Sequence, residues 1–143
     1  MSPKFLLIRE VLAEAARNGR PEITRRGDVE ATFGSVEAFL LALHQRWRTA
    51  LLARLDALLE NIGDDSPADF DAAVVATWND PTTGGRGLRA LLDAHADHPA
   101  LAAAQERDRL LLRRTLGVEV PSPGSRPRVV AHAPAKRWWR GAA

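Results

Sequence analysis

A long apolar stripe between Ser35 and Gly63 constrains the fold of this chain more than any other feature. Large apolar side chains recur there at steps of three and four residues: Val36, Phe39/Leu40, Leu43, Trp47, Ala50/Leu51, Leu55, Leu58/Leu59 and Ile62. That spacing places them on one face of an α-helix of roughly seven turns. Ser35 is a suitable N-cap and Gly63 a suitable stop. We therefore expect a central helix whose apolar face the rest of the chain covers.

Start and stop residues frame four further helical segments. Ser2 and Ser66 are each followed by proline, which joins an N-cap to a residue favoured at the first helical position. Glycine follows two of the segments, and an Asp-containing turn before proline follows the other two. The pattern predicts helices over residues 3–18, 67–79, 87–96 and 99–116. In the first of them, the expected buried residues are Phe5, Ile8, Val11/Leu12 and Ala15/Ala16.

The stretch between the first and the central helix shows no clear stripe. Glycine and proline interrupt it at four positions: Gly19, Pro21, Gly27 and Gly34. Thr24 and Asp28 can each cap a short helix there. Apolar anchors are available at Ile23, Val29 and Phe33. One or two short helices are expected, with an irregular loop as the alternative.

Length and composition fit a single helical domain. A chain of 143 residues can bury a hydrophobic core. It has no cysteine, which excludes disulfides and thiolate sites and suits a cytoplasmic protein. No apolar run approaches the ~18 residues that a membrane span needs. The expected fold class is all-α: a bundle of five to six helices with a proline-rich basic C-terminal tail.

Residues 118–143 differ in character from the helical domain at 1–117. Proline recurs through this tail, so we expect most of it to be extended, with 118–120 or 128–130 able to pair as a short strand. The tail carries five basic residues and one acidic residue, whereas residues 1–117 carry 15 basic and 17 acidic residues. A nearly neutral body is not typical of a strong nucleic-acid binder.

The residues before the central helix resemble a junction in TetR-type transcriptional regulators. The run Thr32-Phe33-Gly34-Ser35-Val36-Glu37-Ala38-Phe39-Leu40 has the order aromatic-Gly-Ser-x-Glu-x-x-Leu. In that family, the recognition helix ends in an aromatic residue, a short turn follows, and a long helix leaves the DNA-binding domain. The resemblance implies an all-helical dimer, with a reduced helix-turn-helix region over 1–43 and effector-like helices over 44–117.

The resemblance also implies where DNA would bind. Four arginines near the reduced region would contact phosphates: Arg17, Arg20, Arg25 and Arg26. A solvated loop is the alternative, because Glu22, Asp28 and Glu30 lie among these arginines and dilute the positive charge.

A small-molecule effector pocket and a dimer interface are further expectations from the resemblance. Aromatic side chains on the inward stripes would line the pocket: Phe39, Trp47, Phe70, Trp78 and His95. The same rings can instead form the core. Arginines on the last helix, together with Leu110–Leu112, would border a homodimer interface or form a solvated face. They are Arg107, Arg109, Arg113 and Arg114.

The sequence offers little support for an enzyme. Asp93, His95, Asp97 and His98 are close in sequence, but their spacing is poor for a metal site on one helical face. No activated nucleophile, glycine-rich loop or paired acid accompanies them. We expect neither catalysis nor a metal or other cofactor.

The tail contains adjacent tryptophans among basic residues. Such a segment can stack on RNA bases, lie on an anionic surface or dock on a protein. Its residues are Arg126, Arg128, Lys136, Arg137, Trp138, Trp139 and Arg140. Two functional hypotheses follow. The first is a TetR-like regulator that binds DNA as a dimer, with a degenerate DNA-binding motif as one version of it. The alternative is a non-enzymatic helical adaptor that docks through this tail.

Overall fold

The computed structural model describes residues 2–63 and 66–122, which form six α-helices and no strand. They are α1 (Pro3–Asn18), α2 (Arg26–Phe33), α3 (Val36–Glu60), α4 (Pro67–Asn79), α5 (Leu88–Ala94) and α6 (Pro99–Leu116). The expected all-α fold is confirmed. In this part of the chain, no helix has both the length and the apolar character needed to cross a membrane.

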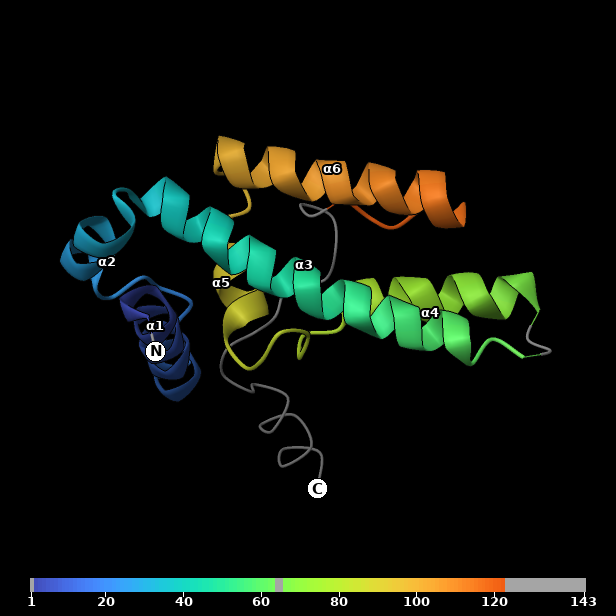
Figure 1. Ribbon diagram of the computed structural model, residues 1–143, viewed down its shortest axis with the longest axis horizontal. Coiled ribbons are helices and arrows are strands. Elements are labelled where there is room, and N and C mark those ends of the chain that lie inside the picture. The colour runs from blue at the N-terminus through green and yellow to red at the C-terminus, as the bar shows by residue number, and fades with distance from the viewer. Residues whose placement is uncertain (1, 64–65, 123–143) are drawn as a thin grey trace, which may run out of the picture.

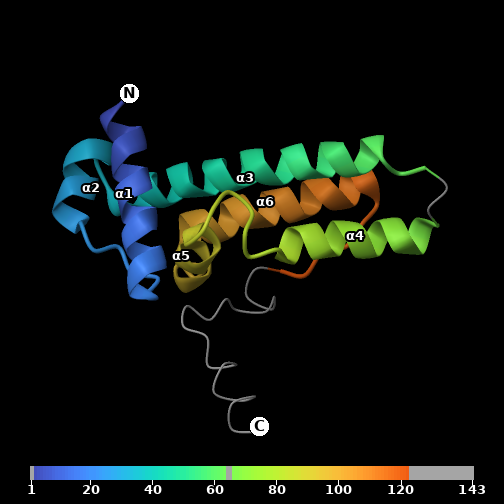
Figure 2. The same cartoon turned by 90° about the horizontal axis from the view of Figure 1, so that it is seen from below.

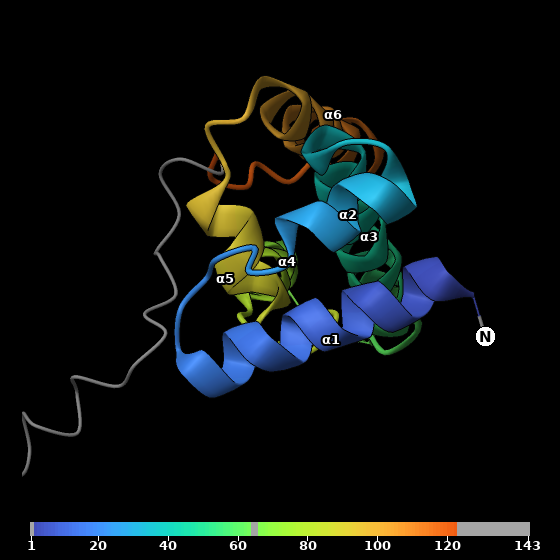
Figure 3. The ribbon, with the colours of Figure 1, turned by 90° about the vertical axis from the view of Figure 1, so that its left-hand side faces the viewer.

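The long helix α3 is the centre of the molecule. It has 25 residues and packs against α2, α4, α5 and α6. Helices α4 and α6 run along its sides, and α5 lies beneath it (Figures 1 and 2). Helices α1 and α2 lie at its N-terminal end, where α1 crosses the bundle (Figure 3). The apolar stripe therefore organises the fold as its length predicted.

Serine caps fix the starts of α1, α3 and α4. The hydroxyl oxygens of Ser2, Ser35 and Ser66 accept hydrogen bonds from backbone N–H groups three residues later, over 3.0–3.2 Å. Each bond satisfies one of the N–H groups that a helix leaves without a partner in its first turn. These local bonds explain why the sequence predicted the helix starts well.

Residues 19–34 form one short helix rather than two. Helix α2 begins after Arg25, whose side chain makes no capping bond. The hydroxyl of Thr24 instead donates to the carboxylate of Glu14 on α1, so Thr24 does not act as a cap. Nor does Asp28, which lies inside α2. Val29 of α2 is buried and anchors this helix to the core. Residues 19–34 therefore contain one helix and not a crossed pair of helices.

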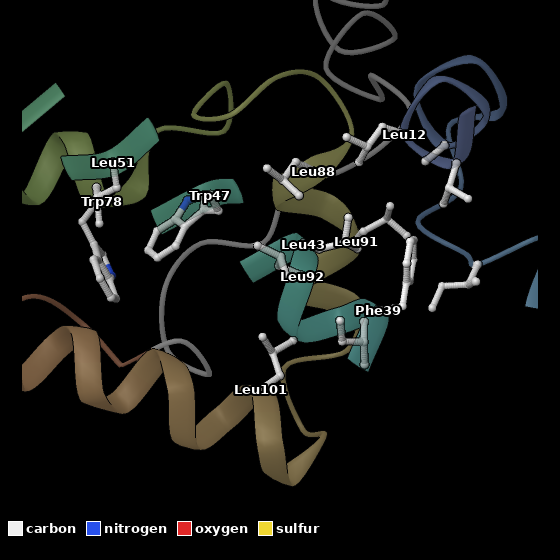
Figure 4. Packing of buried hydrophobic residues seen from close by; sticks show 14 of the residues in the cluster. Leu12, Phe39, Leu43, Trp47, Leu51, Trp78, Leu88, Leu91, Leu92 and Leu101 are labelled. Carbon is white, nitrogen blue, oxygen red and sulfur yellow. The ribbon is translucent and has the colours of Figure 1, made fainter. Parts of the chain in front are cut away.

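The core forms where α3 meets α4, α5 and the start of α6 (Figure 4). Trp47 of α3 and Trp78 of α4 are completely buried, and their ring centroids lie 5.2 Å apart in an edge-to-face arrangement. Leucines from α3, α5 and α6 surround this pair: Leu43, Leu51, Leu88, Leu91, Leu92 and Leu101. Edge-to-face tryptophans contribute packing energy beyond the area that they bury.

Two residues expected on buried stripes lie outside the core: Phe5 of α1 and Leu59 near the end of α3, which is 42% exposed. Phe5 was expected on the buried stripe of α1, but 43% of it is exposed, and Leu7 is buried instead. Phe5 belongs to the first turns of α1, and this end of the helix projects past its neighbours (Figure 3). Helical periodicity gives the face of a helix but not how far along it the partner helices reach.

The packed part of the chain continues beyond α6. Val118 and Val120 are buried, and the indole N–H of Trp78 donates to the carbonyl oxygen of Pro121 over 3.0 Å. Residues 118–120 lie outside any helix and do not pair as a strand with the rest of the described chain. The first residues of the predicted tail therefore complete the core. Residues 128–130, the other predicted strand segment, lie outside the described residues.

Candidate functional site

A buried polar cluster joins α3 to α6. His44 Nε2 lies 2.8 Å from Asp108 Oδ2, and Arg48 Nε donates to Asp108 Oδ1, also over 2.8 Å. His44 and Arg48 are four residues apart on α3, so they lie on the same face. His44 and Asp108 are buried, whereas the Arg48 side chain is 34% exposed. We call these three residues the His–Asp–Arg cluster.

Asp108 is ionised in this cluster. Burial acts to raise its pKa, but the hydrogen bonds and charges of His44 and Arg48 outweigh burial, and the pKa lies below its ordinary value. Because the carboxylate can only accept, His44 must carry a proton on Nε2. His44 Nδ1 is buried and has no hydrogen-bond partner among the described residues. The cluster therefore fixes the position of Arg48 and holds its charge close to the bundle.

An open hollow of about 450 Å³ lies over this cluster, between α3 and α6. We call it the α3–α6 groove. Its lining consists of His44, Gln45, Arg48, Ala104, Arg107, Asp108, Leu110, Leu111 and Arg114. The lining therefore has three arginines and one carboxylate, Asp108, which is already paired with His44 and Arg48. Leu110 is 37% exposed and adds an apolar patch between Arg107 and Arg114.

The lining of the groove presents guanidinium groups, which suit contact with negatively charged groups. No serine, threonine, cysteine or lysine is among its lining residues, so an obvious nucleophile is missing there. His44 Nδ1 is buried, so it does not reach a molecule bound in the groove. Arg48 uses Nε for Asp108, and its two terminal nitrogens remain for a carboxylate or phosphate.

The arginines of α3 and α6 divide between structural and groove positions. On α6, Arg109 pairs with Glu106 and Glu119, and Arg113 lies 3.4 Å from Glu119. On α3, two others hold the turn before α5: Arg46 donates to the carbonyl of Gly84, and Arg54 pairs with Asp80. The groove retains the remaining three: Arg48, Arg107 and Arg114.

The four arginines predicted to bind DNA are not equivalent in the structure. Arg25 forms ion pairs with Glu10 and Glu14 of α1, so its charge is used within the fold. Arg17, Arg20 and Arg26 are exposed, and none of them belongs to an ion pair in the described part of the chain. Residues 2–37 as a whole contain six basic and six acidic residues, which gives this end of the molecule no net positive charge.

Most of the predicted pocket aromatics lie in the core. Trp47 and Trp78 pack against each other, and the ring of Phe39 packs edge-on against that of Phe33 at 5.1 Å. Phe70 is partly buried against the same core. None of the four lines the α3–α6 groove. The alternative interpretation of these rings, as core residues, therefore describes their positions.

The fifth pocket candidate, His95, lines a second hollow of about 430 Å³ between α5 and the segment before α2. This hollow also includes Pro21, Glu22, Ile23, Arg26 and Ala94. The structure thus brings His95 close to Arg26, which the sequence had assigned to a different site. Its lining includes one acidic residue, Glu22, and one arginine, Arg26, whose charges are opposite.

The residues weighed as a metal site are directed elsewhere. Asp93 forms a buried ion pair with Arg89, and His95 Nδ1 lies 2.8 Å from the carbonyl oxygen of Leu91, to which it donates. Within residues 2–63 and 66–122, no group of three or more histidine, cysteine, aspartate or glutamate side chains could hold a metal ion. The seven tail residues predicted to bind a partner lie outside the described residues: Arg126, Arg128, Lys136, Arg137, Trp138, Trp139 and Arg140.

The His–Asp–Arg cluster was not predicted from the sequence, although the sequence contains a signal for it. The inward stripe of α6 runs Leu101, Ala104, then Leu112, and Asp108 occupies the missing step between them. An acid at an inward position requires a cationic or donor partner. On α3, His44 sits beside Leu43 at the edge of the inward stripe and could have been proposed as that partner.

Comparison with protein-family models, with curated proteins and with solved structures found no match to this chain.

Proposed function

We propose that this chain is a non-enzymatic helical binding module that holds an acidic segment of a partner protein in the α3–α6 groove. The observation that supports the proposal most is the groove itself. Three arginines, the exposed Leu110 and the partly buried Leu111 line an open hollow, above a carboxylate already paired with His44 and Arg48. Complementary charge at such a surface speeds encounter and selects among partners.

The groove combines two kinds of contact that suit a peptide. Arg48 is held in place by Asp108, so little conformational freedom is lost when its terminal nitrogens bind a carboxylate. Leu110 and Leu111 supply apolar area beside the charges. Apolar contact gives affinity, and the arginines restrict it to acidic partners.

DNA binding by a TetR-like regulator is the second candidate. It is favoured by the exposure of Arg17, Arg20 and Arg26, which lie in the last turn of α1, just after α1 and at the start of α2. The single short helix α2 and the pairing of Arg25 with two glutamates count against it. We therefore rank it below the binding module.

A crossed experiment separates the two candidates. One variant reverses charge in the groove (Arg107→Glu with Arg114→Glu), and a matched variant makes the same charge change on and after α1 (Arg17→Glu with Arg20→Glu). Each is titrated with a fluorescent glutamate-rich peptide and with duplex DNA. We expect peptide binding to weaken about tenfold in the groove variant only, because attraction at two positions becomes repulsion.

The other outcomes overturn the proposal. Salt-sensitive duplex binding that the Arg17/Arg20 variant loses, without peptide binding by the wild type, would favour the TetR-like regulator. Duplex binding lost only in the groove variant would assign the groove to nucleic acid. Circular dichroism of both variants verifies that they remain folded.

A further inference from the structure

We propose that the segment bound in the α3–α6 groove is an amphipathic helix with two acidic residues seven positions apart and a pair of apolar residues between them. This inference rests on the proposed function and specifies its partner. It also excludes an extended peptide and a second copy of this chain as the occupant.

The spacing of the groove residues on α6 supports a helical partner. Arg107, Leu110, Leu111 and Arg114 follow the steps i, i+3, i+4 and i+7, and all four line the groove. They therefore form one face of α6, apolar in the middle and cationic at each end. Seven residues of helix rise about 10.5 Å. A partner helix repeats this rise with the pattern acid-x-x-apolar-apolar-x-x-acid, which reads the same in both chain directions.

An extended segment fits this face less well. A strand covers about 10.5 Å in roughly three residues. Its two residues between the acids would point to opposite sides, so only one of them could contact the leucines. A helix places both apolar residues and both acids on one face. Two long helices with a hollow between them are also the surface on which amphipathic helices dock in other recognition systems.

Helix α3 adds positive charge to the other side of the groove. Arg48 contributes a third cation to the groove, and Gln45, one turn earlier, lines it without charge. Arg48 is the α3 arginine that lines the groove, because Arg46 and Arg54 are held at the turn before α5. The partner helix consequently meets positive charge on both of its flanks and needs acids or neutral residues there.

A second copy of this chain is a poor occupant. In a two-fold dimer the same surface meets itself, so Arg107 and Arg114 would face arginines of the other copy. The sequence contains only two acid pairs with the required spacing, Glu30/Glu37 and Asp64/Asp71. Helix α2 ends at Phe33, inside the first pair, and α4 begins at Pro67, inside the second. The C-terminal segment after Ser122 has no acidic residue at all.

Three labelled peptides of about 18 residues, long enough to populate a helix, test the inference on the full-length protein. The matched peptide has glutamates seven positions apart around a Leu-Leu pair. The shifted peptide has the same composition, with one glutamate moved two positions so that it leaves the face. The extended peptide carries glutamates three positions apart and prolines that prevent a helix.

We expect the matched peptide to bind about tenfold more tightly than the shifted one. In the shifted peptide only one of the two glutamates still reaches an arginine of the groove. Arg107→Glu with Arg114→Glu should remove this difference, and Arg17→Glu with Arg20→Glu should preserve it. Equal binding of matched and shifted peptides, weakened alike by the groove variant, would overturn the inference and leave the proposed function intact.

Two further results would also decide against it. Preference for the extended peptide would overturn the helical partner but keep the acidic one. Failure of all three peptides to bind would overturn the proposed function as well. Sedimentation of the protein alone tests the last alternative: self-association abolished by Arg107→Glu with Arg114→Glu would assign the groove to a second copy.

Discussion

The two sides of α3 are built from different chemistry. Toward α4 and α5 the helix presents Trp47 and leucines, which meet Trp78 and the leucines of α5 in a closed apolar core. Toward α6 it presents His44 and Arg48, which meet Asp108 beneath an open groove. The apolar side buries area and supplies most of the stability. The polar side tolerates an opening because its charges are paired and partly hydrated.

Under the proposed function, stability and recognition are separated on the two sides of one helix. Changes on the apolar side should unfold the protein, whereas changes at the outer edge of the groove should alter binding and leave folding nearly intact. The buried Asp108 lies between these extremes, because it supports both the α3–α6 contact and the position of Arg48. Four predictions test the contrast.

The largest effect is expected for Trp78→Ala. The change removes the edge-to-face contact with Trp47 and leaves a cavity in the core, at a cost of about 3–5 kcal/mol. Urea unfolding followed by circular dichroism measures it. Trp78→Phe serves as the control, because it keeps a ring against Trp47 and loses mainly the hydrogen bond to Pro121, so its cost should be smaller. If both variants lost the same unfolding free energy, the ring contact between Trp78 and Trp47 would not be the main contribution of Trp78 to stability.

Asp108→Asn should have the next largest effect. The neutral amide cannot satisfy His44 and Arg48 as the carboxylate does, and hydrogen bonds to charged groups each contribute about 1.5–3 kcal/mol. The same unfolding experiment measures the loss. Asp56→Asn, an exposed position on α3, is the matched control and should leave the unfolding midpoint almost unchanged. A midpoint for Asp108→Asn equal to that of the wild type would contradict the structural role of the cluster.

The contribution of Asp108 should depend on pH. Its pKa in the folded protein is lowered, so its stabilisation is complete above the pKa of the unfolded chain, about 3.9, and is lost as pH falls toward the folded value. The difference in unfolding free energy between wild type and Asp108→Asn should therefore shrink as pH falls below about 4. A difference that grows as pH falls would contradict a lowered pKa for Asp108 in the folded protein.

The smallest effect on stability is expected for Leu110→Ala in the groove. This leucine is already partly hydrated, so its removal should cost less than about 0.5 kcal/mol while weakening the matched peptide. Leu112→Ala on the same helix is the control. Leu112 is buried and its truncation should cost about 2–5 kcal/mol. If Leu110→Ala and Leu112→Ala lowered the unfolding free energy equally, the groove would not be separable from the core of the protein.

The sequence predicted the helices better than it predicted the site, for a physical reason. Caps, first-turn prolines and terminal glycines act within a few residues, so Ser35 and Pro67 could be interpreted without knowing the fold. The ion pair of His44 with Asp108 joins positions 64 residues apart. Periodicity marks both as inward or nearly so but does not say which inward residues meet.

The error at Phe5 and the single helix in residues 19–34 have a related cause. Local pattern showed that Phe5 lies on the same helical face as Leu12, but exposure depends on where the covering helices end. Likewise, Thr24 has the chemistry of an N-cap, and the nearby carboxylate of Glu14 competes successfully for its hydroxyl. In both cases a tertiary neighbour, absent from any local window of sequence, decided the outcome.

The separation of His44 from Asp108 also has a consequence for synthesis of the protein. When the chain leaves the ribosome, α3 is complete long before α6 appears, and Arg48 then has no Asp108 to hold it. The groove comes into existence only when the last described helix docks. A partner of the proposed kind, which requires Arg48, Arg107 and Arg114 together, would therefore not bind a chain that ends before α6.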